Sequence, residues 1–335
     1  MTTAYSAAAP AADDPAAVRQ LLIQQATWEA DDVISLRLVD PSGAALPAWT
    51  PGAHLDVILP SGLVRQYSLC GEQEDRSTYT IAVLREPAGR GGSSELHQSA
   101  RPGTKLAVRG PRNHFELEPA ASFLFIAGGI GITPVLPMAR RVSRDGAPWQ
   151  LLYGGRSSTS MAFLRELEAL GDHITIRPED RHGLLDLDTA LRDTEPGTHV
   201  YCCGPPALIA AVEDRCRDLL PESALHVERF APAEPSTGGD QQEARGEQSF
   251  EVELRRTGRT VTVPPGMTIV DAVRDVVPDV MTSCEEGFCG TCETKVLEGV
   301  PEHHDTILNA AERANGKTMM ICVGRACSSR LVLDL

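Results

Sequence analysis

The sequence predicts a multidomain protein in which an antiparallel β-barrel is followed by a doubly wound α/β domain and a smaller α+β domain. Short runs of alternating apolar and polar residues, separated by Gly and Pro, fill residues 18–117. Continuous apolar runs alternate with helical patterns over residues 118–230. A polar run rich in Gly and Pro, residues 231–246, is expected to be a linker to the last domain, residues 247–335.

The composition excludes several classes of function. A chain of 335 residues has room for two or three domains. Its formal net charge of -15 argues against binding to nucleic acid or to an anionic membrane surface, because both require clustered Lys and Arg. No apolar run approaches the roughly 20 residues of a membrane span, and residues 1–17 lack the parts of a secretory signal. We therefore expect a flexible leader over residues 1–17 and a protein without membrane contact.

The barrel is indicated by strand patterns at Ile34–Leu38, His54–Leu59 and Tyr79–Leu84. Several short strands at this spacing are typical of a small antiparallel barrel or sandwich.

One further strand of this domain carries side chains suited to binding. Strand alternation places Arg65 and Tyr67 on one face, and Gln66 and Ser68 on the other. An arginine beside an aromatic ring and a hydroxyl can bind a phosphate and flank a flat ring. An ordinary surface strand explains the segment equally well.

A glycine-rich loop with the sequence GRGGSS, residues 89–94, follows the strand expected at Tyr79–Leu84. Gly91 and Gly92 precede Ser93, which is a candidate N-cap for a helical stretch. The exposed amides of a helix N-terminus bind phosphate readily. The alternative is a loop capped for structural reasons alone.

The second domain opens with Phe123–Ala127, a continuous apolar run of the kind found in buried parallel strands. Three glycines, Gly128, Gly129 and Gly131, permit a tight turn after it. Thr133 can then cap a helix whose first position suits Pro134. The dinucleotide fingerprint G-x-G-x-x-G is met only in part, because a proline occupies the third glycine position. Further strands are expected at Trp149–Tyr153, His173–Arg177, Thr198–Cys202 and Leu225–Glu228, and helices at Met161–Leu170 and Pro206–Leu220.

Nucleotides bind such sheets beyond the carboxyl ends of the strands. Cys203, Gly204 and Pro205 lie at one of these ends, where Cys203 either lines a site or fills the core as a small apolar residue. Arg156 and Ser157 lie at another, where an arginine can accommodate an extra ribose phosphate. A solvated turn is the alternative for Arg156.

The last domain is expected to hold a strand pair at Phe250–Leu254 and Thr260–Val263, a helix at Thr268–Val277 and a final strand at Leu331–Leu333.

Its four cysteines form the most specific motif of the chain. Cys284, Cys289 and Cys292 stand in the spacing C-x4-C-x2-C, and Cys322 follows after a longer gap. This is the spacing of a plant-type ferredoxin, in which four thiolates hold a 2Fe–2S cluster. A zinc site is the alternative, but structural zinc usually recruits cysteines as short pairs. The cysteines outside the motif are odd in number and irregular in spacing, which favours a reducing, cytoplasmic compartment: Cys70, Cys202, Cys203, Cys216 and Cys327.

With these motifs in order, the chain resembles the phthalate dioxygenase reductase family over nearly its whole length. That family includes vanillate demethylase reductases, and the reductase tails of self-sufficient haem-thiolate monooxygenases are similar. Its members have a flavin barrel, a pyridine-nucleotide domain and a C-terminal ferredoxin of the β-grasp fold. The segments that carry the resemblance are Arg65–Ser68, Gly91–Ser93, Ala127–Pro134, Cys203–Pro205 and His226–Phe230, in which Val227 replaces a frequent aromatic residue.

The resemblance implies an NAD(P)H oxidoreductase that passes electrons through FMN and a 2Fe–2S cluster to an oxygenase partner. The partner would be a Rieske oxygenase or demethylase, or a haem-thiolate monooxygenase, and the reductase itself would be a monomer. FMN is expected because the serine-bearing loop accounts for one terminal phosphate, and FAD is the alternative. A cluster-based redox sensor and a stand-alone reductase of free flavin or oxygen are the other functions to consider. The family's simpler members favour NADH, whereas Arg156 slightly favours NADPH.

The resemblance also implies the roles of individual residues. Ser68, Cys203 and Glu228 would line the contact between flavin and nicotinamide, with Phe230 closing the pocket, and no acid–base catalyst is needed for direct hydride transfer. The remaining expected cofactor contacts are Arg65, Gln66, Tyr67, Ala82, Val83, Leu84, Gly91, Gly92, Ser93, Gly128, Gly129, Gly131, Thr133, Pro134, Arg156, Ser157, Gly204 and Pro205, and the expected iron ligands are Cys284, Cys289, Cys292 and Cys322.

Overall fold

The computed structural model divides the chain into two compact units, Met1–Glu228 and Arg229–Leu335. It describes residues 15, 17–217, 219–221, 224–230 and 248–335. The predicted linker, and the predicted leader apart from residues 15 and 17, lie outside the described residues.

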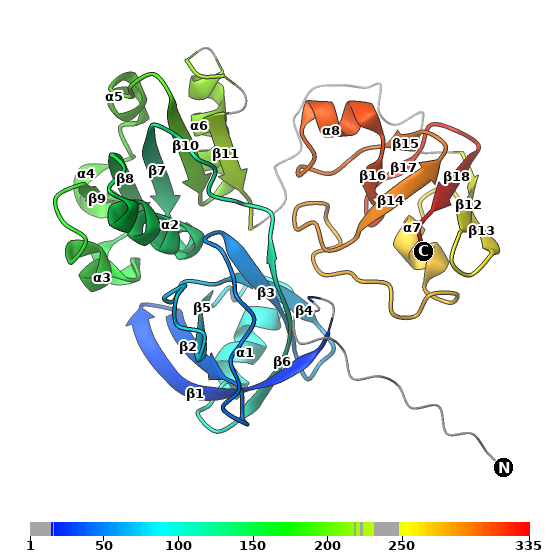
Figure 1. Ribbon diagram of the computed structural model, residues 1–335, viewed down its shortest axis with the longest axis horizontal. Coiled ribbons are helices and arrows are strands. Elements are labelled where there is room, and N and C mark those ends of the chain that lie inside the picture. The colour runs from blue at the N-terminus through cyan, green and yellow to red at the C-terminus, as the bar shows by residue number, and fades with distance from the viewer. Residues whose placement is uncertain (1–14, 16, 218, 222–223, 231–247) are drawn as a thin grey trace. The chain divides into compact units, whose positions relative to one another are not determined.

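The first domain of the first unit is a six-stranded antiparallel sheet (Figure 1). Its strand order is β4-β3-β6-β1-β2-β5, and a single bridge between Leu69 and Ile81 joins the two end strands, which closes the sheet into a barrel. One helix, α1, accompanies it. The bounds are β1 Arg19–Ala30, β2 Val33–Val39, β3 Ala53–Ile58, β4 Val64–Ser68, β5 Thr78–Leu84, α1 Gly92–Ser99 and β6 Lys105–Asn113.

The alternating residues of these strands supply the barrel core, which explains the period of two in the sequence. On β2 and β5, Leu36, Leu38, Ile81 and Val83 are fully buried. The predicted strands therefore all form, with ends that differ from the prediction by one residue.

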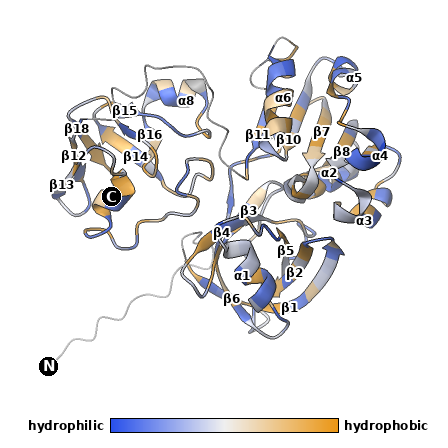
Figure 2. Cartoon of the chain, turned by 180° about the vertical axis from the view of Figure 1, so that it is seen from behind, coloured by the Kyte–Doolittle hydropathy of each residue, from blue (hydrophilic) through white to orange (hydrophobic). Residues whose placement is uncertain are grey.

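The second domain is a five-stranded parallel sheet with the order β11-β10-β7-β8-β9. Two hydrophobic cores lie on its opposite faces, one shared with α2 and α3 and the other with α5 and α6, so the sheet is doubly wound. Figure 2 shows α4 as largely hydrophilic, in contrast to strand β7 of the sheet. The bounds are β7 Ser122–Gly128, η1 Gly129–Gly131, α2 Ile132–Asp145, β8 Trp149–Gly155, η2 Ser158–Ser160, α3 Leu164–Glu168, β9 Ile174–Pro178, α4 Glu179–His182, α5 Leu187–Arg192, β10 Thr198–Cys203, α6 Pro206–Cys216 and β11 Leu225–Glu228.

Strand β7 is buried on both faces because it lies in the middle of this sheet. Phe123 and Phe125 enter one core, and Leu124 and Ile126 enter the other. This accounts for the continuous apolar run in the sequence.

The helix predicted over Met161–Leu170 is shorter than expected. Phe163 adopts a left-handed conformation with φ of 62°, and α3 begins only at Leu164. A side chain in this conformation cannot continue a right-handed helix, so the prediction was wrong for the first turn.

Helix α2 joins the parallel domain to the barrel. Arg140 donates from Nη1 to the backbone oxygen of Cys70 at 3.0 Å, and its Nε lies 3.3 Å from a carboxylate oxygen of Glu72. Arg144 forms a second ion pair with Glu74. These contacts connect the two domains of the first unit through one helix face.

The second unit contains a mixed five-stranded sheet with the order β13-β12-β18-β14-β16. Strands β12 and β18 run parallel, and the other neighbours run antiparallel. The predicted helix over Thr268–Val277 forms only as α7, with Thr268 as its N-cap. The bounds are β12 Phe250–Leu254, β13 Arg259–Val263, α7 Ile269–Val273, β14 Glu293–Glu298, β15 Pro301–Glu302, α8 Ala310–Asn315, β16 Thr318–Met320, β17 Arg325–Ala326 and β18 Arg330–Leu333.

The three predicted fold classes are confirmed by this architecture and by the comparisons reported below. Within the described ranges, no helix is both long and apolar enough to cross a membrane.

Candidate functional site

The four cysteines predicted as iron ligands are brought together and are all buried. Three lie in the loop between α7 and β14, and Cys322 follows β16. The sulfurs of Cys292 and Cys322 are 3.1 Å apart. The backbone amide of Cys284 donates to the sulfur of Cys289 at 3.4 Å, and the amide of Glu286 donates to Cys284 at the same distance.

These sulfurs form one connected group. Side-chain contacts join Cys284 to both Cys289 and Cys322, and Cys322 to Cys292. Four buried thiols gathered in this way can hold a 2Fe–2S cluster or a tetrahedral zinc ion, and the C-x4-C-x2-C spacing favours the cluster.

The loop around the sulfurs depends on unusual backbone conformations. Gly287 and Gly290 have φ of 75° and 74°, and Glu285 has φ of 57°. A Cβ on Gly287 would lie 2.7 Å from a methyl carbon of Val323. Only glycine can adopt this conformation at so closely packed a position. The loop therefore requires Gly287 in order to pack tightly around the buried thiols.

A second site lies where the barrel meets the carboxyl ends of β10 and β11, and we call Ser68, Cys203 and Glu228 the strand-end site. Cys203 and Glu228 are direct neighbours in the β10–β11 ladder. Ser68, at the end of β4, contributes a side-chain hydrogen bond to the Glu228 carboxyl group. The three residues expected at the flavin–nicotinamide contact therefore do lie together, although they come from two domains.

The electrostatics of the strand-end site favour neutral groups. Loss of water around Glu228 raises its pKa from 4.5 to about 8, and the hydrogen bond from Ser68 opposes the shift only in part. Burial also raises the pKa of the Cys203 thiol well above its usual value, with a smaller contribution from Glu228. The Oε2 atom of Glu228 is buried and has no hydrogen-bond partner among the described residues. A buried polar atom without a hydrogen-bond partner is costly, so this oxygen fits a bound group that can form a hydrogen bond with it.

The glycines at the ends of β7 and β10 allow these strand ends to approach closely. A Cβ on Gly131 would lie 2.2 Å from the carbonyl oxygen of Cys203, and a Cβ on Gly128 would lie 2.7 Å from the ring of Pro205. The chain order of the sheet reverses between β7 and β10, and nucleotides bind at such a switch point. Gly129 and Gly204 belong to the same two turns.

The capping role predicted for Thr133 and the first helical position predicted for Pro134 were wrong. Helix α2 begins at Ile132 after a 3₁₀ turn, so both residues lie inside its first turn. The hydroxyl of Thr133 donates to the carbonyl oxygen of Ile130 at 2.9 Å instead of capping the helix.

The glycine-rich loop and Arg65 lie against each other, as the phosphate hypothesis requires. A Cβ on Gly92 would lie 2.8 Å from both Cγ and Nε of Arg65. Gly91, with φ of 85°, is the N-cap of α1. Ser93 is therefore not the N-cap that we predicted, and its hydroxyl accepts a hydrogen bond from the amide of Glu86 at 3.0 Å.

The other barrel residues expected to bind the cofactor lie on β4 and β5. Tyr67 is partly buried, and desolvation raises its pKa to about 12. Ala82 and Val83 are buried and Leu84 is partly buried. Val83 accepts a hydrogen bond through its carbonyl oxygen from His97 of α1 at 2.9 Å.

Gln66 takes part in a polar cluster that the sequence did not indicate. Its amide nitrogen donates to Asp56 at 3.2 Å and lies 3.1 Å from Nε2 of His54. The fully buried Asp56 also accepts a hydrogen bond from Arg112 at 2.6 Å. Burial lowers the pKa of His54 to about 3, and Arg112 adds to this effect. The Asp–Arg partners are far apart in sequence, so no local pattern reveals them.

Arg156 and Ser157 follow β8 at the carboxyl edge of the sheet. The Arg156 side chain is exposed, and Arg177 is exposed at the end of the neighbouring strand β9. Asp180, in the first turn of α4, donates its amide to the carbonyl oxygen of Arg156 at 3.1 Å. One acidic residue, Asp180, therefore approaches this strand end in space, although none is present in the local sequence. Phe230, expected to close the pocket, is 40% exposed.

Comparisons with known proteins agree with this architecture. Residues 125–214 match the oxidoreductase NAD-binding domain, and residues 252–331 match the 2Fe-2S iron-sulfur cluster binding domain. The chain is 42% identical to phenoxybenzoate dioxygenase subunit beta of Ectopseudomonas oleovorans, over 94% of this chain and 97% of that protein. It is 38% identical to phthalate dioxygenase reductase of Burkholderia cepacia, over 91% of this chain and 94% of that one.

Solved structures show the same relationship. A phthalate dioxygenase reductase structure matches with a TM-score of 0.67 and 37% identity, covering 96% of this chain and 100% of that one. An intact type IV self-sufficient cytochrome P450 monooxygenase matches with a TM-score of 0.86 and 42% identity, covering 95% of this chain but 41% of that protein. The chain therefore belongs to the phthalate dioxygenase reductase-like family, and it is an NAD(P)H oxidoreductase with a flavin and a 2Fe–2S cluster that serves as the reductase component of oxygenase systems.

Proposed function

We propose that this reductase carries FMN and delivers electrons from NAD(P)H, through its cluster, to a Rieske oxygenase or demethylase or to a haem-thiolate monooxygenase. The observation that carries the proposal is the strand-end site. A serine from the flavin barrel and a cysteine and a glutamate from the nucleotide domain meet at one point, which is what a flavin and a nicotinamide in contact would require.

The residues of the strand-end site would orient the nicotinamide without exchanging protons with it. Cys203 stays a neutral thiol because its pKa is far above the physiological range, so it offers a small surface without charge. The unpartnered Oε2 of Glu228 is suited to form a hydrogen bond with a carboxamide, which offers both a donor and an acceptor. Ser68 holds Glu228 through a hydrogen bond, and Phe230 is proposed to shield the pocket. The flavin supplies the hydride and electron chemistry when it is bound.

The proposal of FMN as the flavin rests on two features of the barrel, the Arg65 side chain and the first turn of α1. Arg65 lies over Gly92 at the first turn of α1, so a guanidinium and helix amides converge on one place. Such a pairing suits a single terminal phosphate group. Gly91, Ser93 and Tyr67 are proposed to complete the contacts at the phosphate and the ring. Further contacts to the cofactor are proposed for Gln66, Ala82, Val83 and Leu84.

Nucleotide binding is proposed at the turns after β7, β8 and β10. Gly128, Gly129, Gly131, Thr133 and Pro134 would face the pyrophosphate, together with Gly204 and Pro205. Arg156 and Ser157 would contact the ribose end, where Arg177 adds a second exposed positive charge and favours NADPH. The nearby Asp180 would favour NADH. We propose that NADPH is accepted at least as well as NADH.

Two measurements on the purified protein test this proposal. Flavin released by denaturation is separated by chromatography and identified by mass, and FMN is expected, whereas FAD would refute that part. The reductase is then combined with a purified Rieske oxygenase and, separately, with a haem-thiolate monooxygenase, and product formation is followed. NAD(P)H oxidation without product from either would contradict the assignment of partner. Size-exclusion chromatography tests the expected monomer, and cell fractionation tests the expected cytoplasmic location.

A further inference from the structure

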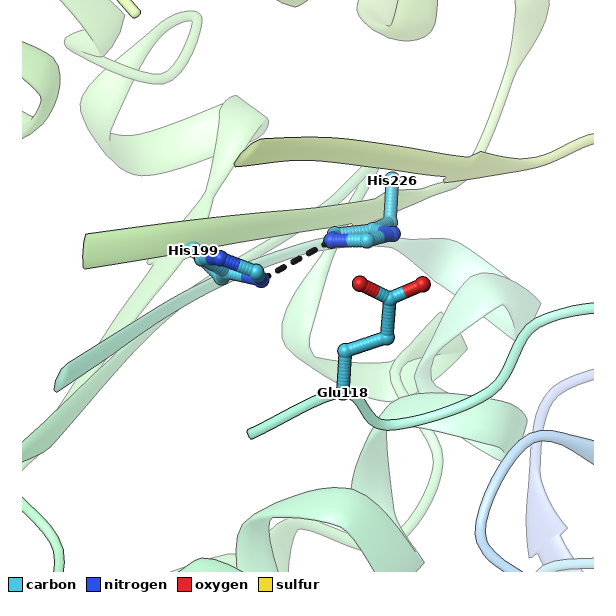
Figure 3. A group of neighbouring side chains, drawn as sticks. All are labelled: Glu118, His199 and His226. Carbon is cyan, nitrogen blue, oxygen red and sulfur yellow. Dashed lines mark hydrogen bonds between the residues drawn. The ribbon is translucent and has the colours of Figure 1, made fainter. Parts of the chain in front are cut away.

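A group of three potential metal ligands shares no residue with the two sites described above. Glu118, before β7, approaches His199 of β10 and His226 of β11, and one ligand atom from each lies within 4.8 Å of the others (Figure 3). Within the described ranges this is the only group of three His, Cys, Asp or Glu residues so arranged. Glu118 is exposed and the histidines are partly buried, so the group is open to solvent.

The two imidazoles are spaced as chelating ligands are. Nε2 of His226 lies 3.0 Å from Nδ1 of His199. Two nitrogens bound to one tetrahedral zinc ion at about 2.0–2.1 Å are about 3.3 Å apart, close to this distance. Figure 3 shows the carboxylate of Glu118 directed toward the same two rings. A single ion in place of the shared proton would therefore reach all three side chains with little movement.

Tyr201 holds the ligands in position from behind. Its ring stacks on that of His226, with centroids 4.3 Å apart and planes within 9°. Its hydroxyl accepts a hydrogen bond from the amide of Glu118 at 2.7 Å and donates to the carbonyl oxygen of Glu116 at 3.2 Å. One buried side chain thus fixes both a histidine ring and the backbone of the carboxylate ligand, and such outer contacts govern metal affinity.

We propose that Glu118, His199 and His226 bind one divalent transition-metal ion such as Zn²⁺, with water in the remaining positions. Two imidazoles and one carboxylate form a ligand set that suits zinc and its neighbours in the first transition row, and suits calcium or magnesium poorly. The carboxylate offsets part of the charge of the ion, and the net charge of -15 on the chain favours cation binding.

The position of the ligands gives the site a structural consequence. Strand β11 is a short edge strand of the sheet, and it is held on one side only, by β10. His226 and Glu228 point to the same face because they are two residues apart on this strand. A bound ion would tie β11 to β10 and to the segment before β7. It would thereby stabilise the strand that positions Glu228.

The test is a calorimetric titration of the intact protein, with flavin and cluster in place, using ZnCl₂. All proteins carry Cys327→Ser, because this exposed thiol could bind zinc by itself. We expect one zinc ion per chain and a rise in the thermal unfolding midpoint of the protein when zinc is present. Each of His199→Ala, His226→Ala and Glu118→Gln should weaken binding roughly 10-fold or more, since even outer partners of a metal contribute about that much.

Glu118→Gln removes only an exposed charge, so its result does not depend on whether the histidine variants fold. His182→Ala, an exposed histidine on α4, is the matched control and should bind zinc as the parent does. Absorbance of flavin and cluster verifies that each variant is intact. Zinc binding that is equal in the parent and in all three ligand variants, or absent in the parent, would overturn the proposal and leave a hydrogen-bonded histidine pair.

Discussion

The cluster loop and the strand-end site are assembled in opposite ways. Three of the four predicted iron ligands, Cys284, Cys289 and Cys292, lie on one loop, and Cys322 joins them within the same small domain. Ser68, Cys203 and Glu228 instead come from three strands in two domains. The first site is built by local chain geometry, with glycines at positive φ, and the second is built by the packing of a barrel against a parallel sheet.

This difference determines how each site should respond to damage. A loop that wraps a cluster depends on its individual ligands, because each sulfur is irreplaceable. A site at the junction of two domains depends on backbone distances and on burial, because its side chains reach one another only when both domains are packed. The following substitutions test this contrast, beginning with the largest expected effect.

Replacement of Cys289 by Ser should abolish or destabilise the cluster, because a hydroxyl is a poor ligand for iron in place of a soft thiolate. Reduction of cytochrome c should fall to background, while reduction of the flavin by NAD(P)H continues. Visible and EPR spectra report the cluster. Cys327→Ser is the control and should leave it intact, since Cys327 is exposed and outside the sulfur group. An unchanged spectrum in Cys289→Ser would refute the ligand assignment.

Replacement of Gly131 by Ala should damage the junction of β7 and β10. The new Cβ would lie 2.2 Å from the Cys203 carbonyl oxygen, so backbone must move. We expect a loss of about 2–3 kcal/mol in the free energy of unfolding, together with a higher KM for NAD(P)H. Gly146→Ala is the control, because a Cβ there meets nothing and costs only the strain of φ at 72°, about 1 kcal/mol. Equal losses in both variants would show that the close approach is unimportant.

Replacement of Arg65 by Ala should weaken flavin retention roughly 10- to 100-fold, because a charge-assisted phosphate contact is lost. The measurement is the fraction of flavin that stays bound through dialysis. Arg85→Ala removes an arginine that pairs with Asp32 at the surface, and it should retain its flavin. If Arg65→Ala also held stoichiometric flavin, the phosphate site would lie elsewhere.

Replacement of Glu228 by Gln should change the pH dependence of stability. The native carboxyl group keeps its proton up to a pKa of about 8, whereas the unfolded one releases it near 4.5. The native state therefore binds more protons between these values, and stability falls as pH rises, by on the order of 1 kcal/mol per pH unit. A glutamine side chain does not titrate, so the stability of the Glu228→Gln variant should not fall with pH in this way. Urea unfolding midpoints from pH 5.5 to pH 8 compare the two proteins, and parallel curves would contradict the assigned pKa.

Replacement of Arg156 by Ala should lower kcat/KM for NADPH by about tenfold, because an exposed cation next to the extra phosphate is removed. The value for NADH serves as the internal control and should hardly change. Equal effects on both nucleotides would identify Arg156 as a solvated turn residue. Asp180→Asn offers the converse test, since loss of that carboxylate should affect NADH more than NADPH.

The sequence by itself determined the three fold classes, and it predicted the four cysteines that the structure brings together. Alternating and continuous apolar runs report which faces of a strand are buried, so they distinguish an antiparallel barrel from a parallel sheet. The spacing of Cys284, Cys289 and Cys292 restricts the thiolates to one loop, because the chain between them is short. The domain boundaries themselves remain predictions.

Only the tertiary structure decided which distant residues meet. The contact of Ser68 with Glu228 requires barrel and sheet to be packed, and the approach of Asp180 to Arg156 requires β9 to lie beside β8 in the sheet. The left-handed Phe163 shortened a helix that periodicity alone extended. The grouping of Glu118, His199 and His226 could not be predicted from the sequence for the same reason. Their proximity follows from the order in which β7, β10 and β11 lie in the sheet, and strand order is a property of packing that no local pattern encodes.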